Sequence, residues 1–270
     1  MDLLYKRDGR NPAELESALG ADMTRFSVRN VSNTLLQAVL FILALAVGAT
    51  PGCTAAEEGP AFKFTLGSYR YSDDSQGVDA NLRHTSGLGN VWLGYFRLPD
   101  QDVSQWRGGW DRMFGEDVRF SPSLQLASGG FEGGSVALEA GAPWFASVGL
   151  GRTNLKPYYN LNFDPNDSYS LSAGRRDESG QLFAVQYVRD NRENPSQRHL
   201  HFVYRQPFDG GNRLTVDVLY KKGLVEDELI KRWGFTLAYD WPRFFVRLAR
   251  DPKTNFTPVD AWRFSVGTRF

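Results

Sequence analysis

The chain has 270 residues, and its 31 Lys and Arg side chains balance 31 Asp and Glu side chains, so the formal net charge is zero. A neutral chain carries no global positive field, which argues against nucleic acid as a partner. Aromatic residues make up 14% of the chain, yet the mean hydropathy is −0.40. Outside residues 35–49, no segment approaches the ~20 apolar residues of a spanning helix, which excludes a helical membrane protein.

The N-terminal part contains the three parts of a secretory signal. Arg25 and Arg29 follow Met23, an apolar run occupies residues 35–49, and small residues follow at 54–56. A run of about fifteen apolar residues is typical of a signal peptide and short for a membrane helix. We expect residues 23–56 to be the signal peptide and residues 57–270 the mature domain. Residues 1–22 are expected to be an over-extended gene start, with a cytoplasmic extension as the alternative.

Cys53 is the only cysteine of the chain. In a lipoprotein it would become the lipidated first residue, but the preceding residues 50–52 lack the Leu that such signals usually contain. We therefore expect cleavage after Ala55 or Ala56, which leaves a mature chain with no thiol and no disulfide.

Beyond residue 57, apolar and polar residues alternate in one short segment after another, as in residues 118–126, 213–221 and 232–240. Successive side chains of a strand point to opposite faces, so this alternation predicts strands with one apolar face. Turn-forming residues separate the segments at thirteen places, which predicts an all-β chain of about fourteen strands. Residues 156–163 are ambiguous, and counting them as a strand makes twelve strands possible.

The last ten residues alternate most clearly, with Trp262, Phe264, Val266 and Phe270 on one face. Ten residues is about the length that a tilted strand needs to cross a bilayer. At this point the chain resembles the bacterial outer-membrane β-barrel family, whose last strand alternates in this way and ends at an aromatic residue. Thr268 departs from the pattern, because a larger apolar residue is usual there.

The resemblance implies an antiparallel transmembrane β-barrel that is exported to the bacterial outer membrane. Only a closed barrel lets so polar a chain cross a bilayer, because every second residue faces the interior. The resemblance also implies contact with outer-membrane lipids and lipopolysaccharide, and recognition of Trp262, Phe264, Val266 and Phe270 by the barrel-assembly machinery. Both termini are expected in the periplasm.

The predicted interior face is rich in arginine. Alternation places these residues there: Arg83, Arg119, Arg205, Arg213, Arg232, Arg243, Arg247 and Arg263. Rings of basic side chains attract anions, so the lumen is a candidate passage for a small anionic solute. The alternative is an internal salt-bridge network that fills the lumen and holds the barrel in shape. The sequence alone does not decide between the passage and the salt-bridge network.

His199 and His201 share the inward face of one predicted strand. Two such ligands could hold a metal ion, but no third His, Cys or assigned carboxylate stands beside them in the sequence. We therefore predict packing in the lumen, with no metal and no cofactor.

His84-Thr85-Ser86 is the one segment that suggests enzyme chemistry. His84 and Ser86 share the lipid-facing side, and an imidazole beside a hydroxyl is a minimal activated nucleophile. The segment resembles the His-x-Ser element of two outer-membrane lipid hydrolase families, phospholipase A and the lipid A 3-O-deacylase. Fourteen strands would place the pair at the periplasmic end, where a turn-capping Ser is the alternative. A non-enzymatic channel or structural surface protein is therefore favoured over a hydrolase.

Overall fold

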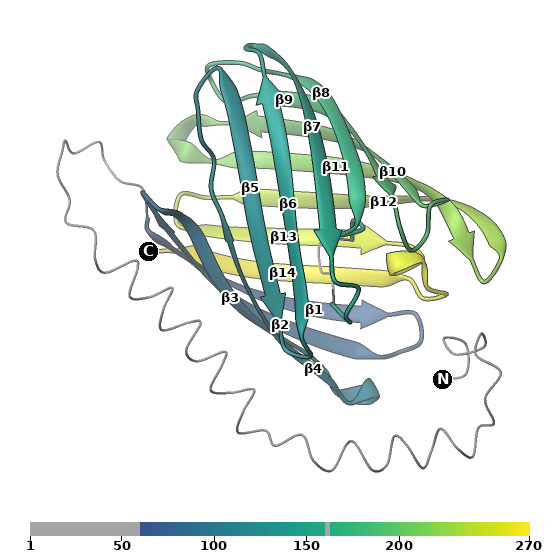
Figure 1. Cartoon of the computed structure of the whole chain (residues 1–270). Helices are drawn as coiled ribbons and strands as arrows, with labels where there is room; N and C mark the ends of the chain where they lie inside the picture. The colour runs from purple at the N-terminus through teal and green to yellow at the C-terminus, as the bar shows by residue number, and fades with distance from the viewer. Residues whose placement is uncertain (1–59, 160–162) are drawn as a thin grey trace, which may run out of the picture. The chain divides into compact units, whose positions relative to one another are not determined.

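The computed structural model describes residues 60–159 and 163–270, which form a closed antiparallel barrel (Figure 1). Its strands are β1 (Phe62–Tyr71), β2 (Gln76–Ser86), β3 (Gly89–Leu98), β4 (Val103–Asp111), β5 (Val118–Ala127), β6 (Phe131–Ala140), β7 (Trp144–Thr153), β8 (Ser168–Arg176), β9 (Leu182–Asp190), β10 (Arg198–Pro207), β11 (Arg213–Val225), β12 (Glu228–Asp240), β13 (Phe244–Asp251) and β14 (Ala261–Arg269). The all-β prediction of about fourteen strands is confirmed. The expected gene start and signal peptide lie outside the described residues.

Each strand pairs with its neighbours in sequence, and β1 pairs with β14 to close the barrel. Their register runs from Lys63 opposite Arg269 to Tyr71 opposite Ala261. Phe62 and Phe270 extend the pairing, since the Phe62 amide donates to the Phe270 carbonyl at 2.8 Å and the reverse bond is 3.0 Å. Closure satisfies the backbone groups that an open edge would expose to lipid.

The two faces of β14 follow the predicted alternation. Trp262, Phe264 and Val266 are 42%, 52% and 40% exposed on the outer wall, whereas Arg263 and Ser265 are buried on the inner side. The lipid-facing and lumen-facing assignments of this strand are therefore correct.

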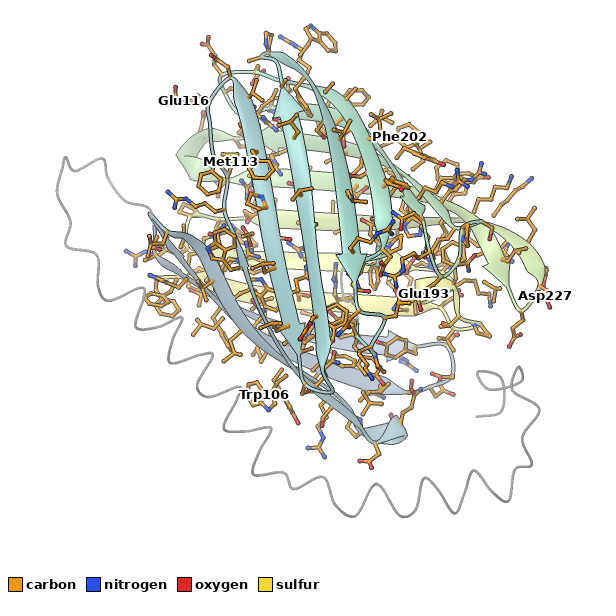
Figure 2. The ribbon with its side chains drawn as sticks, in the orientation of Figure 1. Trp106, Met113, Glu116, Glu193, Phe202 and Asp227 are labelled. Atoms are coloured by element: carbon orange, nitrogen blue, oxygen red, sulfur yellow. The ribbon has the colours of Figure 1, made fainter. Side chains whose placement is uncertain are left out.

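Large aromatic side chains lie on the outer wall near both ends of the strands. Near the end that carries Phe62 and Phe270, the termini of the barrel, are Trp144, Trp241, Phe244 and Phe270; near the opposite end are Trp106, Tyr169, Trp233 and Trp262. Figure 2 shows Trp106 and Phe202 pointing away from the barrel wall. Two such girdles with an apolar band between them are typical of a barrel that spans a bilayer.

The connections differ between the two ends of the barrel. The short turns 87–88, 141–143 and 241–243 lie at the end that carries Phe62 and Phe270, whereas the three longest connections, which join β7 to β8, β9 to β10 and β13 to β14, lie at the other end. This matches the short periplasmic turns and longer outer loops of the barrel class. Asp227 lies at the tip of the long β11–β12 hairpin (Figure 2). Within residues 60–159 and 163–270, no helix is long and apolar enough to cross a membrane.

Leu124→Arg should destabilise the barrel by on the order of 2–4 kcal/mol, because it places a charge on the mid-bilayer face. Leu124 is 60% exposed on the outer wall of β5, whereas the adjacent Gln125 lines cavities inside the barrel. Gln125→Arg is the control and should cost much less. Unfolding titrations in lipid vesicles measure both, and equal losses would contradict the assignment of the two faces.

Candidate functional site in the barrel lumen

The β7–β8 connection enters the barrel, and its described residues, 154–159 and 163–167, are named the lumen loop. The backbone amide of Tyr159 donates to Gln105 Oε1 at 3.0 Å, and Gln105 Nε2 donates to the carbonyl of Pro157 at 2.9 Å. The Tyr159 ring stacks on Phe96, with centroids 5.5 Å apart. Gln105 and Phe96 are inward side chains of β4 and β3, and both are at least 96% buried. The loop therefore docks on the inner wall at β3 and β4.

The far part of the lumen loop contacts another part of the wall. Asp164 is hydrogen-bonded to His199 Nδ1 at 2.6 Å and to His201 Nε2 at 3.0 Å, both on β10. Phe163 packs with Ala249 and Ala261 of β13 and β14. In the closed order of fourteen strands, β4 and β10 are six positions apart. The loop thus contacts opposite parts of the lumen wall. Residues 154–159 do not form a strand, so the alternative that counted residues 156–163 as a strand, and with it the twelve-strand barrel, is excluded.

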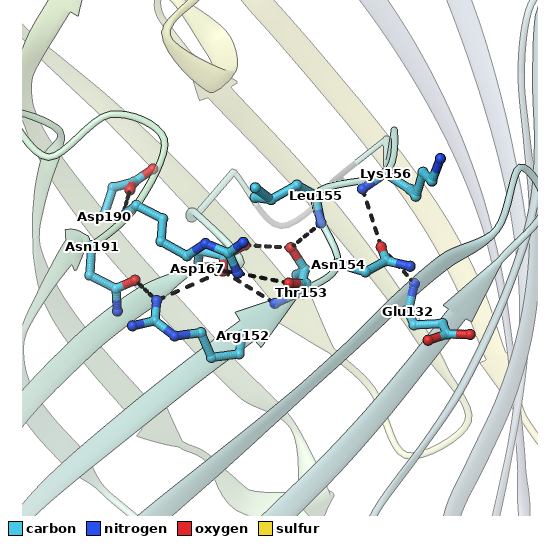
Figure 3. Close-up of polar contacts among 10 residues, drawn as sticks. Glu132, Arg152, Thr153, Asn154, Leu155, Lys156, Asp167, Asp190 and Asn191 are labelled. Atoms are coloured by element: carbon cyan, nitrogen blue, oxygen red, sulfur yellow. Dashed lines mark hydrogen bonds and ion pairs between the residues drawn. The ribbon is translucent and has the colours of Figure 1, made fainter.

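Asp167 fastens the base of the lumen loop (Figure 3). Its side chain is buried and accepts hydrogen bonds from the backbone amide of Thr153 at 3.2 Å, from the Thr153 hydroxyl and from Arg192 at 3.1 Å. Arg192 also donates to the Thr153 carbonyl at 2.8 Å, and Arg152 lies 3.8 Å from Asp167. The ends of β7 and β8 and the β9–β10 loop are joined through one carboxylate.

The second carboxylate of the loop, Asp164, lies between two imidazoles. Burial alone would raise the pKa of this carboxyl, but the hydrogen bonds from His199 and His201 outweigh it and hold that pKa well below its ordinary value. Asp217 contacts the other nitrogen of His201, Nδ1, at 3.0 Å. Asp164 is therefore a carboxylate at neutral pH, held on β10.

A cavity of about 350 Å³ lies inside the barrel, and Tyr158 of the lumen loop forms part of its wall. Its charged lining is unbalanced, with five cations against two carboxylates: Lys63, Arg83, Arg107, Arg247 and Arg263 against Asp79 and Asp111. The ion pairs are Arg107 with Asp79, and Arg83 with Asp111 at 3.6 Å. The lumen loop therefore leaves space beside it, and that space carries excess positive charge.

A second cavity, of about 590 Å³, lies nearer the termini. Its charged lining consists of Arg176, Arg205, Arg213, Arg269 and Asp240. Asp240 pairs with Arg213 at 3.3 Å and with Arg269. Nearby, Glu139 pairs with Arg119 at 2.8 Å and with Arg176 at 2.9 Å. Glu139 and Asp240 are thus each shared by two arginines, whereas each carboxylate of the first cavity pairs with one.

Several lumen cations form no ion pair with any residue of 60–159 and 163–270, namely Lys63, Arg205 and Arg247. Two predicted lumen residues lie elsewhere: Arg243 is exposed in the β12–β13 turn, and Arg232 is exposed in the outer half of β12. Alternation gives the face of a residue and not its depth, which is why these two differ from the other six.

The His84 and Ser86 side chains do not form a nucleophile and base pair. Within the described residues, His84 Nδ1 has no hydrogen-bond partner, and its ring packs on Phe62 with centroids 4.6 Å apart. Ser86 Oγ accepts from the Leu88 amide at 3.3 Å, so it caps its own turn. Asn90 is the nearest candidate to orient the His84 imidazole, but its side chain is hydrogen-bonded to Thr85 and Asp111. The pair lies at the end that carries the termini.

The lumen loop is not marked by any sequence motif for function. Its signal is composition, because the aromatic residues Tyr158, Tyr159 and Phe163 lie in a connection rather than in a strand. Exposed loops seldom concentrate aromatic rings, and here the rings pack inside the barrel. No feature of the sequence around Asp164 predicts its contact with His199 and His201.

No family model matches the chain, and no curated protein is significantly similar to it in sequence. The similar solved structures are bacterial outer-membrane porins and channels. The outer membrane protein Omp33 of Acinetobacter baumannii is 11% identical, with 78% of this chain and 98% of that chain covered and a TM-score of 0.49. The NanC porin is 9% identical over 77% and 100% of the two chains, with a TM-score of 0.43. The KdgM porin is 9% identical over 77% and 99%, with a TM-score of 0.41.

Asp167→Ala should release the lumen loop, because the substitution removes the acceptor shared by Thr153 and Arg192. Leaving a buried hydrogen-bonding group without its partner typically costs about 1–3 kcal/mol, here as local opening, and the exposed Arg192 and Arg152 are solvated by water when the carboxylate is removed. Chymotrypsin should then cleave after Tyr158 or Tyr159 in the variant and much more slowly in the native protein. Asp73→Ala, in the β1–β2 turn, is the control. Equal cleavage rates for native protein and Asp167→Ala would show that Asp167 does not hold the loop.

Proposed function

We propose that this protein is a narrow, anion-favouring channel of the bacterial outer membrane. The observation that carries the proposal is the unbalanced charge of the cavity beside the lumen loop, where five cations face two carboxylates. In a lumen with low-dielectric walls, such an excess raises the local concentration of anions. The solute class is a small anion whose charge is recognised by guanidinium and ammonium groups.

The lumen loop supplies the narrowing. A fourteen-stranded barrel is wider than one that side chains can fill, so a segment docked across it sets the size of any passage. Tyr158 stacks on Phe131, with centroids 4.2 Å apart, and Tyr159 stacks on Phe96. Rigid aromatic contacts hold the loop at a fixed position, which favours a passage of defined width over a mobile obstruction.

The salt-bridge network and the passage coexist in this arrangement. Glu139 and Asp240 each tie two arginines together and hold the wall. Lys63, Arg205 and Arg247 remain available to a solute, because no carboxylate of the described residues pairs with them. The outer-membrane location is part of the same proposal and is supported by the apolar outer wall and its aromatic girdles. Outer-membrane lipid and lipopolysaccharide would contact that wall.

The combined change Arg205→Gln and Arg247→Gln should weaken anion selectivity. In a planar bilayer under a salt gradient, the reversal potential should move toward zero, and more so at low salt, because screening at 0.1 M acts over about 10 Å. Arg70→Gln is the matched control, since its side chain is 74% exposed beside the β1–β2 turn. If the native protein shows no single-channel current steps, the channel proposal is wrong and the salt-bridge network that fills the lumen is the remaining interpretation.

The combined change Tyr158→Ala and Tyr159→Ala should raise single-channel conductance, because two ring contacts that hold the loop are lost. Tyr169→Ala removes an exposed outer-wall ring and is the control. Unchanged conductance in the lumen-loop variant, with the fold intact, would show that the loop does not limit the passage.

A further inference from the structure

Three side chains from two distant segments meet where the lumen loop docks on β10. Asp164 Oδ1 lies 2.6 Å from His199 Nδ1 and 3.0 Å from His201 Nε2. His199 is completely buried, and His201 is 7% exposed. One ligand atom from each residue lies within 4.8 Å of the other two. The third ligand that the sequence around the two histidines lacks is therefore supplied by a loop 35 residues away.

The atoms that meet are ligands of one chemical class. Two imidazole nitrogens and one carboxylate oxygen form a donor set that suits zinc and its neighbours in the first transition series, whereas calcium and magnesium prefer oxygen alone. Ligand atoms around a tetrahedral zinc ion are about 3.3 Å apart, given metal–ligand distances of 2.0–2.1 Å. The two contacts of Asp164, at 2.6 and 3.0 Å, are shorter than that separation, so the carboxylate must move back from both rings to admit an ion.

The surrounding groups support the same donor set. Asp217 contacts His201 Nδ1 through both carboxylate oxygens at 3.0 Å, so the ring is oriented with Nε2 toward Asp164. Metal-binding histidines usually donate the second nitrogen to a carboxylate, a backbone carbonyl or water, and a carboxylate does this here. The Gln197 amide lies 3.5 Å from the second nitrogen of His199.

The local charge also favours a divalent cation. Asp164 and Asp217 bring two negative charges to the two imidazoles. The nearest buried ammonium, Lys221, lies opposite His199 in the β10–β11 pair, but it is neutralised by Asp251 at 2.8 Å and also contacts the Phe256 ring that stacks on His199. A divalent ion therefore meets a matched charge and no uncompensated cation.

We propose that Asp164, His199 and His201 bind a zinc-class divalent ion that fastens the lumen loop to β10. The ligand atoms are Asp164 Oδ1, His199 Nδ1 and His201 Nε2, which leaves a fourth position for water. Because one ligand belongs to the loop and two belong to the wall, the ion joins the two sides of the lumen directly.

Isothermal titration of Zn²⁺ into the exported protein, purified in detergent without a polyhistidine tag, tests the site. We expect one ion per barrel, binding that Mg²⁺ does not reproduce, and loss of binding in His201→Ala and in Asp164→Ala. Asp217→Asn should weaken binding by about 10- to 100-fold, because it alters the group that orients a ligand. His84→Ala is the matched control, since His84 is the third histidine of the chain and lies on the outer wall.

Absence of Zn²⁺ binding, equal binding by His201→Ala, or equal affinity for Mg²⁺ would each overturn the proposal. Heat-modifiable migration of each variant shows whether the barrel is folded. A second readout rests on the proposed channel function: Zn²⁺ should reduce current fluctuations of the native channel and not those of His201→Ala. Calorimetry needs no conductance, so the metal site and the channel can fail independently.

Discussion

The requirement that every backbone polar group be paired inside a bilayer governs this structure. A strand cannot satisfy its own amides, so the sheet must close, and β14 meets β1 along the register from Tyr71–Ala261 to Lys63–Arg269. Closure then fixes the side chains, because alternate residues must face lipid or lumen. The outer face becomes apolar and aromatic, and the polar half of the sequence is confined to the interior.

The interior of a barrel of fourteen strands is too wide to be filled by the side chains of its wall alone. The lumen loop answers this constraint by entering the barrel and docking through rings and backbone hydrogen bonds on β3 and β4. Farther along the loop, Asp164 contacts β10, where His199 and His201 are hydrogen-bonded to its carboxylate. The interior thus combines fixed packing across the lumen with space beside it, which is the arrangement that a selective passage needs.

Strand number and facing could be predicted from the sequence because they depend on local alternation and turns, whereas closure was implied by the resemblance of the last strand to outer-membrane barrels and by the polarity of the chain. The lumen loop could not, because its contacts join residues far apart in the chain: Tyr159 and Gln105 are separated by 54 residues, and Asp164 and His199 by 35. The same limit explains Arg232 and Arg243, for which the face was predicted but the position along the barrel was not. The contact of Asp164 with His199 and His201 also required the fold.

The distribution of carboxylates decides what the lumen can do. Glu139 and Asp240 each hold two arginines, so part of the basic lining is structural and unavailable to solutes. Asp164 and Asp167 both belong to the lumen loop, and each is committed to contacts that hold it, at β10 and at the loop base. The acidic groups therefore stabilise the wall and the lumen loop. Lys63, Arg205 and Arg247 have no carboxylate partner among the described residues and add positive charge to the two cavities. Stability and the proposed anion preference have the same origin, since the carboxylates that hold the barrel together are fewer than the cations of the cavity lining.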